Sequence, residues 1–178
     1  MDKPVELIPL VCLKCATAIQ AQADEVAWCC AQCGQGQLLD EEKGLVPLEI
    51  QFAAGLAPQR KGKPFWVATG QVTLQRERYS GNQNQQAAEL WSQPQRFFVP
   101  AFACKLDDLL ALGAGMLMRP PALQPGPAAP FDPVVLSPED VKATAEFVVM
   151  SIEAERKDKL KEARFSLQLS APVLWILP

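Results

Sequence analysis

The stretch CLKCATAIQAQADEVAWCCAQCG, residues 12–34, carries five of the six cysteines of this 178-residue chain. Cys12 and Cys15 form one CxxC pair, Cys30 and Cys33 form another, and 14 residues separate the two pairs. A CxxC turn lets two thiolates of one tight loop point at the same cation, and two such turns supply the four-sulfur tetrahedron that Zn²⁺ prefers in structural sites. The spacing therefore predicts a structural zinc site held by these four cysteines.

The assignment of the second pair depends on which of two adjacent cysteines takes part. Cys30 is preferred over Cys29 because only Cys30 leaves two residues before Cys33. Gly34, which follows this pair, permits the positive φ that lets backbone amides wrap around a sulfur. Two alternatives remain open: four reduced cysteines without a metal, and iron in a rubredoxin-like site, because four thiolates alone do not distinguish iron from zinc.

This pattern resembles a zinc ribbon over residues 9–40, the four-cysteine module of transcription elongation factors, RNA polymerase subunits and some ribosomal proteins. The chain departs from the pattern in three ways. The spacer is one residue shorter than the usual range of about 15–20, Ala16 rather than glycine follows the first pair, and Cys29 adjoins Cys30. Because four protein ligands fill the tetrahedron, we expect the metal to stabilise the fold and not to activate water.

The composition is that of a globular protein, with 49% hydrophobic and 21% charged residues. The longest apolar run, 109–118, is much shorter than the roughly 20 residues of a membrane-spanning helix. The first ten residues carry acids where a secretory signal has a basic stretch. We therefore expect no transmembrane segment and a cytoplasmic location, where thiols stay reduced and bind metals more often than they form disulfides.

Two further features of the composition restrict the function. The chain has no histidine, so Ser-His and Cys-His nucleophile pairs and imidazole metal ligands are impossible. The net charge is only −3, but it is unevenly distributed: residues 1–44 carry a net −4 and residues 45–105 a net +4. The acidic end is therefore the predicted metal end, and a basic region follows it.

Hydrophobic periodicity predicts an α+β domain after the ribbon. Helices are expected from Asp107 or Asp108 to just before Pro120, and from the capping box that begins at Ser137. Between them, 119–133 is rich in proline and is expected to be an extended connector. Alternation of apolar residues predicts strands over 46–52, 64–75, 97–104 and 164–170, and the fully apolar run 173–177 predicts a further one, in a mainly antiparallel sheet.

Other segments give weaker indications. Residues 76–96 are polar and glutamine-rich, which favours a long loop, and 155–162 could extend the second helix or form a turn, with a strand over the preceding residues as the alternative. Cys29 and Cys104 are expected to be small buried residues. The predicted domains are a zinc ribbon at 1–42 and the α+β domain at 43–178.

The segments 64–66 (PFW) and 99–102 (VPAF) loosely resemble parts of uncharacterised bacterial zinc-ribbon proteins, a resemblance that implies no activity. The hypothesis we favour is a non-catalytic, zinc-stabilised binding or adaptor protein that docks a protein partner or joins a homo- or hetero-oligomer. The alternative is a nucleic-acid or anionic-surface binder that uses the basic 60–78 region. The candidate binding residues of these two hypotheses are Arg60, Lys61, Lys63, Trp66, Arg76, Arg78 and Trp91.

An enzyme is the third hypothesis. Carboxylates, lysines and Tyr79 could serve in acid–base chemistry, but the sequence places no two of them together. The glycines of LGAGM (112–116) lie in a helix-like apolar run without a preceding strand, so they do not indicate a phosphate-binding loop. We therefore expect no catalytic residues.

Overall fold

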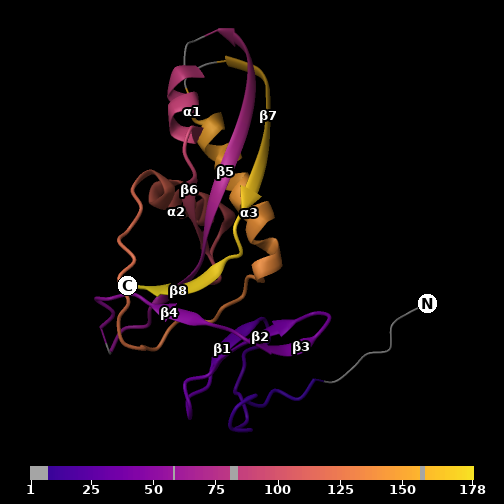
Figure 1. Ribbon diagram of the computed structural model, residues 1–178, viewed down its shortest axis with the longest axis vertical. Coiled ribbons are helices and arrows are strands. Elements are labelled where there is room, and N and C mark those ends of the chain that lie inside the picture. Colours follow the sequence, from indigo (N-terminus) through magenta and orange to yellow (C-terminus); the bar gives the residue numbers. More distant parts are fainter. Residues whose placement is uncertain (1–7, 58, 81–83, 157–158) are drawn as a thin grey trace, which may run out of the picture.

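The computed structural model describes residues 8–57, 59–80, 84–156 and 159–178. Within these ranges the chain forms two sheets and three α-helices (Figure 1). This confirms the α+β class and adds one helix to the two that were expected. The smaller sheet contains β1 (Ala27–Cys29), β2 (Gly36–Asp40) and β3 (Gly44–Pro47), and the larger contains β4 (Ile50–Phe52), β5 (Lys63–Ser80), β6 (Gln95–Pro100), β7 (Lys159–Leu169) and β8 (Val173–Leu177). The helices are α1 (Asn84–Trp91), α2 (Leu106–Met118) and α3 (Val141–Ala154).

The long strand β5 organises the larger sheet. Val67 pairs with Val173 of β8 on one edge and with Phe98 of β6 on the other, and all of these pairings are antiparallel. Three residues further along, Gly70 pairs with Leu169 of β7 on the edge that β8 occupied. β7 and β8 therefore follow one another along the same edge of β5, and β4 adds to the outer edge of β8 in a parallel pairing.

The first half of β5 is buried on both faces. Trp66 belongs to a large apolar cluster that includes Val149 of α3, whereas Phe65 and Val67 belong to a second cluster with Phe98. The sequence predicts one apolar and one polar face for this strand, and the structure instead covers both faces between residues 65 and 68. A strand covered in this way reads as a continuous apolar run, as FWVA does.

The helices pack on the sheet and on one another. α2 lies along β6, and α3 contacts α2, β6 and β7. The two helices approach closely at Gly113, where an added Cβ would lie 2.7 Å from Cγ2 of Val148. Before α3, Ser137 caps a 3-10 turn over Pro138–Asp140, where its side chain accepts a hydrogen bond from the Glu139 amide. The predicted N-cap is therefore present, and the α-helix itself begins at Val141.

One predicted strand is divided. The alternation over 46–52 predicts a single strand, but the structure contains β3 and β4 in two different sheets, separated by Leu48 and Glu49. The Leu48 amide donates to the Gly36 carbonyl, 2.9 Å away, at the end of the β2–β3 pairing. Pro47, which has no N–H group, also favours an end to the strand at this point. The chain therefore passes from one sheet to the other inside a segment of uniform pattern.

The polar region 76–96 is also more ordered than the sequence indicates. β5 continues to Ser80, and α1 follows from Asn84. β7 begins at Lys159 and pairs with the distal half of β5, so the end of the 155–162 segment is strand, and neither helix nor turn. The helix before it extends to Ala154, which excludes the alternative of a strand there. The strand expected over 97–104 spans Gln95–Pro100 instead.

The proline-rich connector joins the two sheets. It is extended, as predicted, and it hydrogen-bonds on both sides of its path: the Gly126 amide donates to Phe52 O (2.7 Å) and the Gly62 amide to Pro130 O (2.8 Å). Just after it, fully buried Val134 forms a bridge with Ala27 of β1, and its carbonyl accepts from the Val26 amide at 2.8 Å. The smaller sheet is thus held against the apolar cluster of the larger one.

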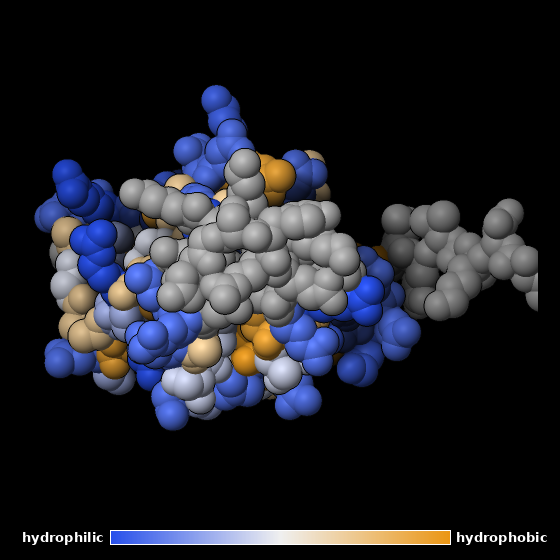
Figure 2. Space-filling view, turned by 90° about the horizontal axis from the view of Figure 1, so that it is seen from above, coloured by the Kyte–Doolittle hydropathy of each residue, from blue (hydrophilic) through white to orange (hydrophobic). Residues whose placement is uncertain are grey.

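The surface has no single dominant apolar region in the view of Figure 2, where the described residues are largely hydrophilic with small, separate hydrophobic patches. None of the helices in the described ranges is long and apolar enough to cross a bilayer. Where burial is described, the exposed large hydrophobic side chains lie in four places: Leu106, Leu112 and Met118 on α2; Phe147 and Met150 on α3; Val173 on β8; and Ile8, Val11 and Leu13 near the first CxxC pair.

Candidate metal centre

The two CxxC turns, called here the first knuckle (residues 12–17) and the second knuckle (residues 30–35), have the same backbone geometry. In the first, the Cys12 amide donates to Thr17 O (2.8 Å) and the Ala16 amide donates to Cys12 O (2.9 Å). In the second, the Cys30 amide donates to Gln35 O (2.8 Å) and the Gly34 amide to Cys30 O (2.8 Å). Each turn thus directs both of its thiols to one side.

A shift of 18 positions, from Cys12 to Cys30, relates the whole of one knuckle to the other. Val11 bridges Ala18 across the first, as Cys29 pairs with Gly36 across the second. Ala16 and Gly34 occupy the equivalent position, and both have positive φ, 56° and 73°. Glycine adopts this conformation freely and alanine does so at a cost, so Ala16 is a strained substitute for the expected glycine.

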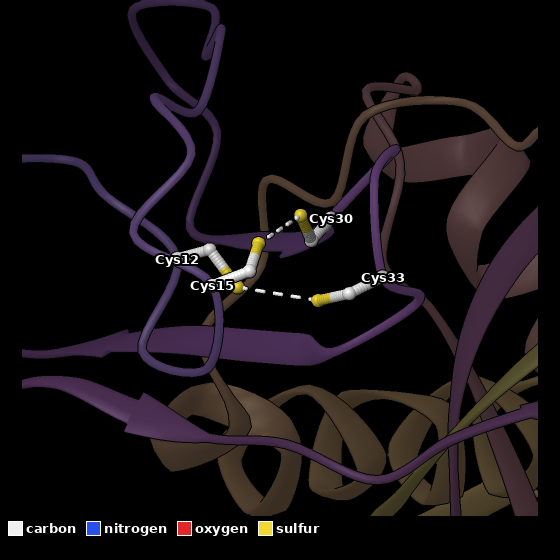
Figure 3. Close-up of side chains that lie close together, drawn as sticks. All are labelled: Cys12, Cys15, Cys30 and Cys33. Atoms are coloured by element: carbon white, nitrogen blue, oxygen red, sulfur yellow. Dashed lines mark hydrogen bonds between the residues drawn. The ribbon is translucent and has the colours of Figure 1, made fainter.

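The four thiols converge (Figure 3). The Cys12 and Cys33 sulfurs are 3.5 Å apart, the Cys15 and Cys30 sulfurs are 3.7 Å apart, and all four lie within 4.8 Å of one another. A Zn–S bond of about 2.3 Å gives a tetrahedron with an edge of roughly 3.8 Å. The cluster therefore has the size of a four-thiolate metal shell, and the structure brings together all four ligands that the sequence predicts.

The exposure of the cluster is uneven. Cys12 and Cys30 are buried, Cys33 is partly buried and Cys15 is exposed. The first cysteine of each knuckle thus faces the interior, and the second lies toward solvent. One side of the cluster rests on the protein, and an ion in it would be reached from the side of Cys15.

Proton affinity differs strongly between the two outer thiols. The hydroxyl and amide groups of Thr17 lower the pKa of Cys15 from 9.0 to about 6. For Cys33, the Gln35 amide acts in the same direction, but desolvation and hydrogen bonds with the three neighbouring sulfurs prevail and raise the pKa to about 12. Close like charges have this effect, because a cluster of four thiolates retains a proton until a cation neutralises it.

The inner thiol of the first knuckle is also affected. Desolvation raises the pKa of Cys12, but the amides of Cys15 and Lys14 outweigh it and the pKa is lowered overall. The Lys14 amide lies 3.4 Å from the Cys12 sulfur. Amide donors stabilise the negative charge of a thiolate, whether the sulfur is free or bound to a metal. The turn therefore favours the deprotonated sulfur.

Gln37 is part of this centre, and the sequence pattern did not identify it. It lies on β2, is fully buried, and its Oε1 accepts from the Leu13 amide at 2.7 Å. Its pairing partner on β1 is Trp28, whose side chain is buried as well. Gln37 therefore fixes the first knuckle to the sheet from which the second knuckle extends. One glutamine in the segment GQLLD (36–40) was the only available signal, and it is not specific.

The remaining cysteines do not join the cluster. Cys29 is partly buried, and its thiol donates to Gly34 O at 3.4 Å; burial, followed by the charges of Cys30 and Cys12, raises its pKa. Cys104 was expected to be buried in a strand, but it is exposed because β6 ends at Pro100. Although the residue as a whole is exposed, partial desolvation of its thiol, followed by the charge of Asp108, raises the pKa of Cys104. Cys29 occupies the strand position that Val11 occupies in the first knuckle.

The two tryptophans among the candidate binding residues do not lie on the surface. Trp66 and Trp91 are buried, 1% and 4% exposed, and cannot stack on a base. Their indole N–H groups donate to Leu136 O (2.7 Å) and to Glu153 Oε1 (3.0 Å), which corrects the expectation that they form a binding surface.

The basic candidates are divided between two parts of the chain. Arg60 and Lys61 are exposed before β5, and Lys63 forms an ion pair with Asp132. Arg76 and Arg78 fall in the distal half of β5, and their side chains lie outside the described residues.

Chemically, the centre is a cage of four sulfurs with the size to hold a single cation. With four protein ligands around it, a tetrahedral ion has no position left for water or substrate. Among the described residues it is the one group of cysteines and carboxylates with metal-binding geometry. No protein-family model, curated protein or solved structure matches this chain.

Proposed function

We propose that this protein is a non-catalytic binding protein whose N-terminal module is held together by one structural Zn²⁺ ion. The ligands are Cys12, Cys15, Cys30 and Cys33. The observation that carries the proposal is the agreement between the sulfur–sulfur distances of 3.5 and 3.7 Å and the edge of a zinc–thiolate tetrahedron. Zinc is chosen over iron because it forms structural four-cysteine sites of this spacing most often.

A structural role for the metal is favoured because the ion would connect the two knuckles to one another. The two knuckles belong to different loops, 18 positions apart along the chain, and the described contacts between the first knuckle and the sheet include one side-chain hydrogen bond, that of Gln37. Structural zinc binding is worth about 10–16 kcal/mol in small peptides. An ion in this cage would therefore supply much of the free energy that folds residues 9–40.

A binding role is favoured by the same closed shell. A full tetrahedron leaves the module without a Lewis-acid site, so its contribution to function is the surface it presents. The surface is acidic: residues 8–44 carry two lysines and five acids, and four thiolates with one Zn²⁺ add a further charge of −2. Such a surface favours a protein partner over a phosphate backbone, which it repels.

Elemental analysis of the native protein tests the metal. We expect one zinc per chain, and the cobalt-substituted protein is expected to show the absorption of a tetrahedral thiolate site. After removal of zinc with a chelator, amide exchange should rise in the first knuckle more than in the second, because the second is the turn of the β1–β2 hairpin. Absence of metal from protein purified without chelators, or a water ligand in the cobalt spectrum, would refute the proposal.

A further inference from the structure

Three apolar side chains are exposed in the segment that leads into the first knuckle and in the knuckle itself, and they are called here the apolar patch. Ile8, Val11 and Leu13 are 39%, 38% and 50% exposed. They lie within six consecutive residues. Isolated exposed hydrophobic residues are ordinary, whereas a group of them in one loop indicates a surface that meets another molecule.

The patch lies between two sources of negative charge. Leu13 stands between the ligands Cys12 and Cys15, next to the metal–thiolate unit. Ile8 lies over the turn between β2 and β3, where a Cβ added at Gly44 would be 3.6 Å from its Cδ1. That turn contains the exposed carboxylates Glu41 and Glu42 beside Lys43, which pairs with Asp40, and Lys14 follows Leu13. With the −2 of the proposed zinc–thiolate unit, the net charge around the patch is negative. An apolar centre with an acidic surround complements a segment that carries apolar side chains flanked by lysine or arginine.

We propose that this patch docks a short basic and apolar segment of a protein partner. The inference rests on the proposed function, because the zinc holds the loop that presents Leu13. A second copy of the chain fits less well, since the same acidic face on both molecules would repel. The small size of the patch implies a weak, salt-dependent interaction that one or two apolar anchors dominate.

A fluorescent peptide in which lysine and leucine alternate is the probe, and the same peptide with glutamate in place of lysine is its control. Binding is measured by anisotropy on the zinc-loaded full-length protein from low to physiological salt. Leu13→Ser removes the central apolar side chain. Leu106→Ser is the matched control, because Leu106 is an equally accessible leucine, 60% exposed, that is followed by Asp107 and Asp108 at the start of α2.

We expect the lysine peptide to bind, to weaken as salt increases and to lose about tenfold in affinity with Leu13→Ser, since burial of one leucine is worth about that factor. Leu106→Ser should leave the affinity unchanged. Equal binding of both peptides, or an equal loss in both variants, would overturn the inference. So would a dimer that Leu13→Ser abolishes, because it would identify a second copy as the occupant.

Measurement of the zinc content of every sample distinguishes failure of the docking inference from failure of the proposed function. If the wild-type protein holds no metal, the proposed function fails. If it holds one zinc and the peptides do not discriminate between the variants, only the docking inference fails. Val11→Ser serves as a second variant, so that a loss of zinc in Leu13→Ser does not decide the outcome.

Discussion

The two knuckles share one backbone design but differ in what supports them. The second is the turn of a hairpin whose strands, β1 and β2, pair over three residues on each side. The first is closed by a single bridge, between Val11 and Ala18, and is tied to the sheet through Gln37. The second knuckle is therefore built into secondary structure, whereas the first is held by that bridge, by the contacts of its thiols with those of the second knuckle, and by one buried amide side chain. The difference teaches that equal CxxC motifs need not contribute equally to a metal site.

The largest effect on zinc binding is expected from removal of one of the four proposed ligands. Cys30→Ala should abolish stoichiometric zinc binding and destabilise the module, most of all its first knuckle, because three thiolates do not complete the shell. Its neighbour provides the control: Cys29→Ala should retain one zinc per chain, since the Cys29 thiol contacts Gly34 O and not the cluster. Metal analysis and circular dichroism measure both. Retention of zinc by Cys30→Ala would show that Cys29 serves as a ligand in its place.

The next effect concerns the amide that fixes the first knuckle. Gln37→Leu removes the acceptor of the Leu13 amide, and a buried hydrogen bond of this kind is worth about 1–3 kcal/mol. We expect zinc affinity to fall by about tenfold or more and zinc exchange to accelerate.

Gln71→Leu is the matched control, because Gln71 also forms a hydrogen bond within the fold, from its Nε2 to Trp91 O, but in the larger sheet. It should lower the free energy of unfolding without a change in zinc affinity. Equal zinc affinities in the two variants would mean that Gln37 does not position the knuckle.

Exchange of the two left-handed residues should give effects of opposite sign. Gly34→Ala has open space for its Cβ, so it isolates the backbone cost and should destabilise the protein by about 1 kcal/mol. Ala16→Gly removes the same strain and should stabilise the folded state by up to about 1 kcal/mol, less the entropy that glycine adds to the unfolded chain. Urea denaturation of the zinc-loaded proteins measures both. Changes of the same sign would contradict the equivalence of the two positions.

The smallest effect is that of pH on the metal-free protein. The pKa of Cys15 is lowered to about 6, so this thiol contributes stability that is complete above pH 9.0 and is lost as the pH falls through 6. The pKa of Cys33 is raised to about 12, so this thiol contributes stability that is complete below pH 9.0 and is lost as the pH rises toward 12. At pH 7, iodoacetamide should therefore modify Cys15 faster than Cys33. Thr17→Val should slow the modification of Cys15, and an unchanged rate would show that the hydroxyl does not stabilise the thiolate.

The sequence predicts best what is decided locally. The CxxC spacing identifies all four sulfurs that converge, and the capping box at Ser137 begins a helical segment as expected. The division between β3 and β4 was missed because the alternation of 46–52 continues unbroken while its pairing partners change from β2 to β8.

Residues 76–80 were missed for a related reason. They form a strand by pairing with β7, about 80 positions further along, which local polarity does not reveal. Gln37, Trp66 and Trp91 were misjudged or overlooked because burial of a polar or amphipathic side chain depends on a distant partner.

The bridge between Ala27 and Val134 has a consequence for the order of biosynthesis. The residues that hold the N-terminal module against the rest of the protein are translated more than a hundred positions after it. At a synthesis rate of about 5–20 residues per second, Val134 is added on the order of 5–20 s after the module. During this interval the two knuckles contact only one another, so early metal binding would stabilise the nascent module before the C-terminal half of the chain is synthesised.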